Sequence, residues 1–286
     1  YPELVTLTMI EDFNTPVRDL LATLVDSNKI APAVYDDYVG NIYFDAKLAF
    51  KKLQRANENS FSQNTDDDND DNYRGPSADG VGEELNRFIT LLMPYYDKNP
   101  QLPKFFDKLL LSNNNLVKLN TAVAMLKSEK PVPDSVWAGI AAKEEFRAPL
   151  YDALKNQKRE QLFPSKYKSN EMMATSALYE QANRKIDSLS LIKKEEITHR
   201  GQKGWVYFYK YKLRKKDNWK IAFSTIVTDK NKDFEAVDEL TLLTNKTLSS
   251  RRSEEEQLTE QWKKRMITQR ESGRQFYAND NTTIDF

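Results

Sequence analysis

The acidic run between residues 66 and 71 contains side chains that could bind a metal ion. Asp66, Asp68 and Asp70 alternate as the first ligands of an EF-hand calcium loop do. The sixth position of such a loop would be Asp71 rather than glycine, and the twelfth would be Ser77 rather than glutamate. The tight turn and the bidentate ligand are therefore missing. We expect a solvated charged segment, and keep weak calcium binding as the alternative.

The single histidine, His199, is the other residue that could be catalytic or bind a metal ion. It stands between a strand-like Ile-Thr-His segment and the turn Arg-Gly-Gln-Lys-Gly. A lone histidine cannot form a zinc site, the chain has no cysteine, and no serine stands in a Gly-x-Ser-x-Gly motif. We therefore expect His199 to be an exposed residue at a strand end. We expect no catalytic residue, metal or cofactor in this chain.

Basic and aromatic side chains are interleaved between residues 203 and 220. The basic candidates for an interaction surface are Lys203, Lys210, Lys212, Arg214, Lys215, Lys216 and Lys220. Cations beside exposed rings are typical of surfaces that bind an anionic polymer. The same alternation is typical of a half-exposed sheet with its aromatic side inward and its lysines outward. We favour the second interpretation because the net charge is zero, and keep polymer binding as the alternative, with nucleic acid the less favoured polymer.

The composition of the chain limits the elements that could position these residues. A length of 286 residues leaves room for two domains, and only 8 glycines favour helices over a phosphate-binding Rossmann type of fold. Residues 1–100 hold 9 Lys and Arg against 18 Asp and Glu, whereas the whole chain holds 43 of each. The first third is therefore acidic and the remainder basic. No apolar window approaches the roughly 18 residues of a membrane span, so none is expected.

Two helical hairpins of similar pattern organise the first half of the chain. Residues 16–53 place apolar side chains at helical spacing around the turn Ser27-Asn28-Lys29, and residues 115–154 do so around Ser128-Glu129-Lys130. The matched apolar positions are Tyr35 with Trp137, Phe44 with Phe146, Leu48 with Leu150 and Leu53 with Leu154. Two helices in about 40 residues are typical of HEAT-like repeats. We expect Trp137, Phe146 and Tyr151 to be core residues, and Tyr43 and Phe50 to belong to the buried stripe of the second helix of the first hairpin.

The remaining helices complete the predicted first domain, residues 1–192. Residues 57–82 are almost without apolar side chains and predict a disordered acidic insertion. Residues 84–111 resume helical spacing as a middle unit, and residues 171–191 predict a helix that caps the stack.

The hydrophobic period changes to alternation in residues 193–286. Strand-like runs occupy residues 195–200, 204–215 and 218–228, with a possible fourth at 235–243. A helix follows Ser253, and its residues Leu258, Trp262 and Met266 would lie across one face of the sheet. The predicted fold class is α+β and mainly α: HEAT-like α-α hairpin repeats followed by a small antiparallel β-meander and a C-terminal helix.

Three segments carry a family resemblance. They read LLLSNNNLVKLNTAVAMLKSEKPVPDSV, FRAPLYDALKNQKREQLFP and GWVYFYKYKLRKKDNWKIAF. They are similar to the C-terminal part of large bacterial proteins whose front end is a TraB/GumN-type domain. That family is regarded as hydrolase-like and has a glycine-and-histidine motif near the start of its domain. Nothing here matches the motif, so the resemblance implies a non-catalytic helical-repeat tail.

These expectations favour an accessory or scaffold region of a larger bacterial protein. It would contact a protein partner or an upstream domain of the same polypeptide, because a chain that begins at Tyr1 rather than Met is expected to be part of something longer. One alternative is binding of an anionic polymer through the Lys/aromatic β unit. The other is a TraB/GumN-type hydrolase whose active site lies outside this chain. The compartment stays open, with export slightly favoured over the cytoplasm.

Overall fold

The computed structural model describes residues 6–7, 11–62, 78–199, 201–228, 234–236 and 240–276. The chain divides into two compact units, Tyr1–Ile140 and Ala141–Phe286. The first is helical, and the second combines helices with a β-sheet. The predicted boundary at 192/193 therefore lies inside the second unit, because helices assigned to the repeat domain pack with the sheet instead. Residues 57–62 and 78–82 of the predicted disordered insertion are helical, which corrects its bounds, and the acidic run between them lies outside the described residues.

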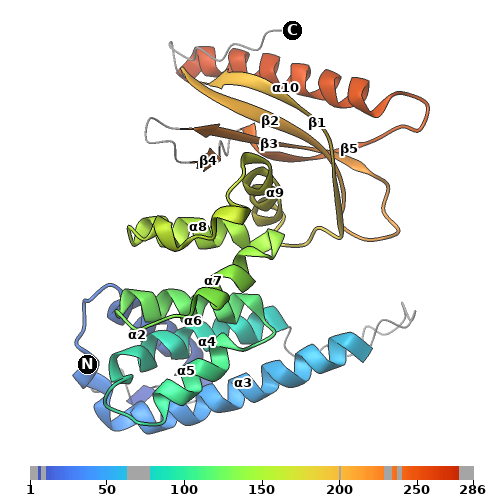
Figure 1. The fold of residues 1–286 in the computed structure, drawn as a ribbon. Helices are drawn as coiled ribbons and strands as arrows, with labels where there is room; N and C mark the ends of the chain where they lie inside the picture. Colours follow the sequence, from blue (N-terminus) through green and yellow to red (C-terminus); the bar gives the residue numbers. More distant parts are fainter. Residues whose placement is uncertain are drawn as a thin grey trace. The chain divides into compact units, whose positions relative to one another are not determined.

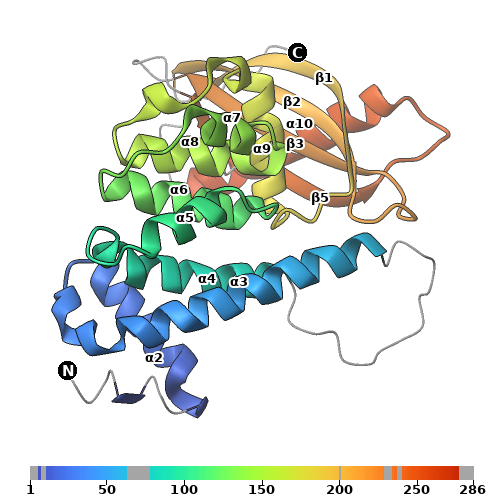
Figure 2. The same ribbon diagram turned by 60° about the horizontal axis from the view of Figure 1, so that its bottom comes forward.

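The first unit is built from helices of unequal length. They are α2 (Glu11–Asp26), η1 (Pro32–Tyr38), α3 (Val39–Ser62), α4 (Ala78–Leu92), η2 (Met93–Tyr95), α5 (Leu102–Leu110), α6 (Asn115–Lys127) and α7 (Asp134–Ala141). The longest, α3, runs beside α4 in both views (Figures 1 and 2). Its buried side chains recur at helical spacing: Ile42, Ala46, Ala49 and Leu53.

The turns of the two predicted hairpins have the same backbone conformation. Asn28 and Glu129 adopt left-handed φ values of 54° and 56°. The N–H of the next residue donates to the carbonyl oxygen five positions earlier, Lys29 to Leu24 and Lys130 to Met125, both at 2.8 Å. This pattern is the Schellman motif that ends many helices. Arg159 and Arg184 make the equivalent bond after two later helices, so the turn does not by itself identify a repeat.

The HEAT-like repeat is not confirmed beyond this turn. After its turn, the first hairpin continues through η1 into the 24-residue helix α3, whereas the second is broken into α7, η3 (Glu144–Phe146) and α8 (Arg147–Asn156). The matched side chains also differ in burial. Phe44 is 63% exposed and Leu48 45% exposed, but Phe146 is 6% exposed and Leu150 is fully buried. Trp137, Phe146 and Tyr151 are buried core residues, as predicted.

The second unit places a sheet between helices. Its elements after α8 are η4 (Glu160–Leu162), η5 (Ser165–Tyr167), α9 (Asn170–Gln181), β1 (Ser188–His199), β2 (Gln202–Lys212), β3 (Lys220–Thr228), β4 (Phe234–Ala236), β5 (Leu242–Thr247) and α10 (Glu254–Phe276). The first three strands form the predicted antiparallel meander. Both β4 and β5 pair with β3, at its end and its beginning respectively. The two short strands therefore share one edge.

Both faces of the sheet are covered, which corrects the expectation of a single covered face. Leu258, Trp262 and Met266 of α10 pack on one face, against a core that includes Phe208 and Phe223. The ring centroids of Trp262 and Phe223 are 5.3 Å apart. On the other face lies α9 (Figure 1), which meets the tyrosine side of β2.

Two further expectations are corrected within this unit. The helix predicted for residues 171–191 ends at Gln181, because Asn183 and Arg184 adopt left-handed conformations, and residues from Ser188 onward belong to β1. The alternation of Ser188, Leu189, Ser190 and Leu191 is a strand pattern rather than a helical one. His199 does end a strand, as predicted, but it is 5% exposed rather than at the surface.

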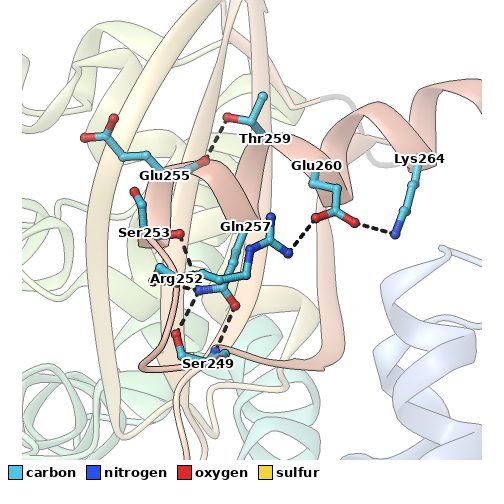
Figure 3. Close-up of polar contacts among 8 residues, drawn as sticks. All are labelled: Ser249, Arg252, Ser253, Glu255, Gln257, Thr259, Glu260 and Lys264. Carbon is cyan, nitrogen blue, oxygen red and sulfur yellow. Dashed lines mark hydrogen bonds and ion pairs between the residues drawn. The ribbon is translucent and has the colours of Figure 1, made fainter.

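The start of α10 is fixed by the buried side chain of Gln257 (Figure 3). Its Oε1 accepts a hydrogen bond from the Ser249 N–H at 2.8 Å, and its Nε2 donates to the Ser249 carbonyl oxygen at 2.9 Å and to that of Arg252 at 3.1 Å. One amide thus satisfies backbone groups of the loop that precedes the helix. None of the described helices is both long and apolar enough to cross a bilayer.

Candidate functional site

The seven basic residues predicted as an interaction surface do not form one patch. Lys203 lies beside the β1–β2 turn, opposite Thr198, while Lys212 is at the far end of β2, opposite Ser188. At about 3.3 Å per residue, the strand separates these two lysines by roughly 30 Å. Lys212 and the other five lie around the β2–β3 turn, so Lys203 is the one that is separate: the five are Lys210, Arg214, Lys215, Lys216 and Lys220.

Two of these lysines are engaged inside the unit. The Lys210 ammonium pairs with Glu254 in the first turn of α10, at 2.8 and 2.9 Å from its two carboxylate oxygens. The ammonium groups of Lys210 and Lys212 also lie 5.0 and 4.9 Å from the centroid of the Trp219 ring. Cation–π contacts of this kind stabilise the hairpin from within. Both side chains are half-buried.

The tyrosines of the predicted surface are not available to a ligand. Tyr207, Tyr209 and Tyr211 are each 2% exposed. The hydroxyl groups of Tyr209 and Thr175 on α9 are 3.0 Å apart and share a hydrogen bond. Burial, followed by the nearby Glu171 carboxylate, raises the pKa of Tyr207 to about 12. These rings cannot stack on bases. Exposed charge remains at the hairpin tip on Arg214, Lys215 and Lys216, near the half-buried Trp219.

A second basic region lies in the first unit, in an open groove of about 900 Å³ between α3 and α5. Its floor is aromatic. The Phe105 ring meets the Tyr43 and Phe50 rings edge to face, with centroids 5.5 and 6.2 Å apart. Residues 43, 47, 50 and 54 of α3 follow helical spacing, and so do residues 101, 104, 105 and 108 around α5. Two helix faces therefore build the groove.

Three lysines stand around this aromatic floor. Lys47 comes from α3, and Lys104 and Lys108 come from α5. The Lys47 ammonium lies 4.6 Å from the centroid of the Tyr43 ring. The other described residues that line the groove are neutral: Gln54, Pro100, Gln101, Leu111, Ser112 and Asn113. The charged side chains of the lining are thus all basic.

Exposed apolar side chains gather in the same unit. Six large hydrophobic residues are exposed among those the structure describes, and four belong to the first unit: Leu20, Phe44, Leu48 and Leu111. Phe44 and Leu48 are one turn apart on α3, on the face next to the one that lines the groove. Leu111, at 79% exposed, stands at the rim of the groove.

The strongly perturbed titratable groups of the first unit are buried tyrosines. Burial raises the pKa of Tyr35, with a smaller effect from Asp36. Burial also raises the pKa of Tyr95, followed by its hydrogen bond to Asp36. The Tyr35 hydroxyl donates to the Leu91 carbonyl oxygen at 3.0 Å, and the Tyr95 hydroxyl to that of Pro32 at 2.6 Å. The pair holds η1 against the end of α4, a role in packing.

The candidates for chemistry at single sites are not brought together. His199 is buried at the end of β1. In the parts of the chain that the structure describes, no three His, Asp or Glu side chains gather in a way that could hold a metal ion. The run Asp66–Asp71 lies outside those parts, so its calcium binding stays untested.

Comparison with known proteins gives no relative. No family model, no curated protein and no solved structure matches the chain. The surfaces of this molecule therefore provide the basis for proposing a function.

Sequence reasoning missed the groove and assigned its residues to the core. Tyr43 and Phe50 belonged to the apolar stripe predicted for α3, which does continue below the groove. The available signal was Lys47, which lies on the same helical face between them, together with Lys104 and Lys108 on either side of Phe105. A lysine at helical spacing within an aromatic stripe indicates that the stripe reaches solvent.

Proposed function

We propose that this chain is a non-catalytic accessory module that binds a partner protein, or another domain of the same polypeptide, through its first unit. The observation that carries this proposal is the pair of exposed side chains Phe44 and Leu48 on α3. Single exposed hydrophobic residues are ordinary on protein surfaces. A phenylalanine and a leucine one turn apart, beside an aromatic groove, form the kind of anchor that protein interfaces bury.

The surroundings of this pair support the same function. Lys47, Lys51, Lys52 and Arg55 are all exposed on α3. An apolar centre with a charged rim is the usual composition of a protein-binding patch. We define the α3 patch as Phe44 and Leu48.

The test is partner capture with the full chain and variants of the α3 patch. In extract from the source cells, Phe44→Ser combined with Leu48→Ser should lower the amount of specifically retained protein at least about tenfold, since buried anchors contribute about 2 kcal/mol or more. Ile267→Ser is the control, because Ile267 on α10 is similarly exposed, at 57%. Equal retention by the double variant and the control would refute the proposal.

A second candidate function is binding of an anionic polymer at the tip of the β2–β3 hairpin. The supporting observation is that three consecutive basic residues, Arg214, Lys215 and Lys216, are exposed there. Such binding would be electrostatic, so retention on heparin or nucleic acid should weaken steeply between low and moderate salt. Retention that is insensitive to salt would exclude this candidate.

The relationship to the C-terminal part of TraB/GumN-type proteins remains a proposal, and so does a HEAT-like origin of the helical hairpins. The first rests on the three segments described above, and the second on the common turn. Sequencing the reading frame upstream of Tyr1 tests the first. A TraB/GumN-type domain there would support an accessory tail of a hydrolase, and its absence would refute that origin.

A further inference from the structure

The groove between α3 and α5 has the chemical features of a ligand site rather than of a packing defect. Its volume of about 900 Å³ is within the range of about 300–1,000 Å³ for binding pockets. Its aromatic floor is fixed in the core, since Phe105 is 5% and Phe50 9% exposed. The walls are therefore preformed.

The charged residues around the groove indicate the charge that a ligand should carry. Lys47, Lys104 and Lys108 are exposed. No ion pair of Lys104 or Lys108 occurs among the described residues, in contrast to Lys127 and Lys130, which pair with Asp26 and Asp97 in the same unit. The positive charge at the groove is thus not neutralised by the described part of the unit that carries it, and it favours an anionic occupant.

The floor and rim also indicate the type of occupant. The half-buried ring of Tyr43, packed on the buried Phe105, offers apolar surface for one bulky side chain, and the exposed Leu111 extends that surface at the rim. The amide side chains of Gln54 and Gln101 can hydrogen-bond a peptide backbone. An open groove admits a continuous chain.

We infer that this groove binds an acidic peptide segment of a partner protein, with one aromatic or aliphatic side chain on the aromatic floor and carboxylates beside the three lysines. This inference rests on the proposed function and specifies the chemistry of the partner. The groove and the α3 patch would then be adjacent parts of one binding surface, the first selecting charge and the second adding apolar contact.

The experiment measures binding of a defined probe to the full chain by fluorescence anisotropy. The probe is a fluorescein-labelled peptide of Glu and Ser with a single central Phe. Lys104→Glu should weaken binding at least about tenfold, because it replaces attraction by repulsion at the site. Lys29→Glu introduces the same charge change in the turn after α2, at an exposed residue that belongs neither to the groove lining nor to the α3 patch, and should change binding less than about twofold. Both residues are exposed, so both variants should keep the unfolding temperature of the parent chain.

Three results would overturn the inference. One is an equal effect of Lys104→Glu and Lys29→Glu, since binding would then follow net charge. Another is undiminished binding of a peptide whose Phe is replaced by Ser, which would remove the role of the aromatic floor. The third is tighter binding of oligothymidylate that is lost in Lys104→Glu, which would assign the groove to nucleic acid.

Failure of the groove inference can be distinguished from failure of the proposed function. If the acidic probe fails to bind while the α3 patch still captures a protein from extract, the groove inference fails and the proposed function stands. If the α3 patch captures nothing either, both fail.

Discussion

The two helical hairpins of this protein, residues 17–53 and 117–154, resemble each other in sequence but differ in which side chains they bury. They share a helix end with the same left-handed residue and the same hydrogen bond. Beyond it, Phe44 and Leu48 face solvent while Phe146 and Leu150 are buried.

The difference shows that a helical hydrophobic pattern specifies which face of a helix is apolar, but not which other element packs against that face. In the second hairpin, α8 packs against α9, and the Ala148 N–H donates to the buried Ser176 hydroxyl at 2.8 Å. In the first, α3 uses one face against α4, and its outward face has no partner among the described residues. The extra apolar residues of α3 are therefore available for binding.

The largest expected effect is the difference in stability between alanine substitutions at the buried Leu150 and at the exposed Leu48. Leu150→Ala should lower the free energy of unfolding by about 2–5 kcal/mol, because it leaves a cavity in a closed core. Leu48→Ala should change it by no more than about 0.5 kcal/mol, as surface substitutions do. Urea unfolding of the two variants measures both values. Equal losses of unfolding free energy in the two variants would show that the two hairpins pack in the same way.

A smaller effect on stability is expected at Tyr35. Its counterpart in the second hairpin, Trp137, is also buried, but only the tyrosine can ionise. Tyr35→Phe should cost about 0.5–1.5 kcal/mol at neutral pH through the lost bond to Leu91. The pKa of Tyr35 is raised in the folded state, so its neutral form contributes stability that is complete below pH 10 and is lost as pH rises above it. The gap between parent and variant should therefore narrow above about pH 10. Unfolding measured at neutral and alkaline pH checks this, and a gap that widens would contradict it.

The smallest effect distinguishes the two turns. Glu129 holds a left-handed φ that glycine adopts without strain, so Glu129→Gly should raise stability by about 0.5–1 kcal/mol. Asn28→Gly should gain only a few tenths of a kcal/mol, because asparagine tolerates this conformation better than glutamate does. Thermal unfolding of both variants gives the order. A larger gain at Asn28 would show that the turns carry different strain.

Much of the local structure followed from residue patterns. The Ser-x-Lys turns, the alternation across residues 204–213 and the Leu258, Trp262, Met266 stripe each predicted their element correctly. The helix predicted for residues 171–191 was correct as far as Gln181 and wrong beyond it, where the left-handed pair Asn183 and Arg184 ends the helix before β1.

The binding surfaces were less predictable than the elements. Lys210 was predicted to face solvent, but Glu254 is distant in sequence and reaches it only through the packing of α10. Tyr43 and Phe50 were predicted to be buried together. Phe50 is buried, but Tyr43 is only half-buried, because α5 meets α3 in a way that leaves a groove.

The sequence alone determined the helices, the strand meander and the chemistry of the turns, because these depend on neighbours within a few residues. The tertiary structure decided which stripes became core, which cations were neutralised and where a basic aromatic groove remained open. Burial and ion pairing depend on residues brought together from distant parts of the chain, and periodicity carries no information about which ones these are.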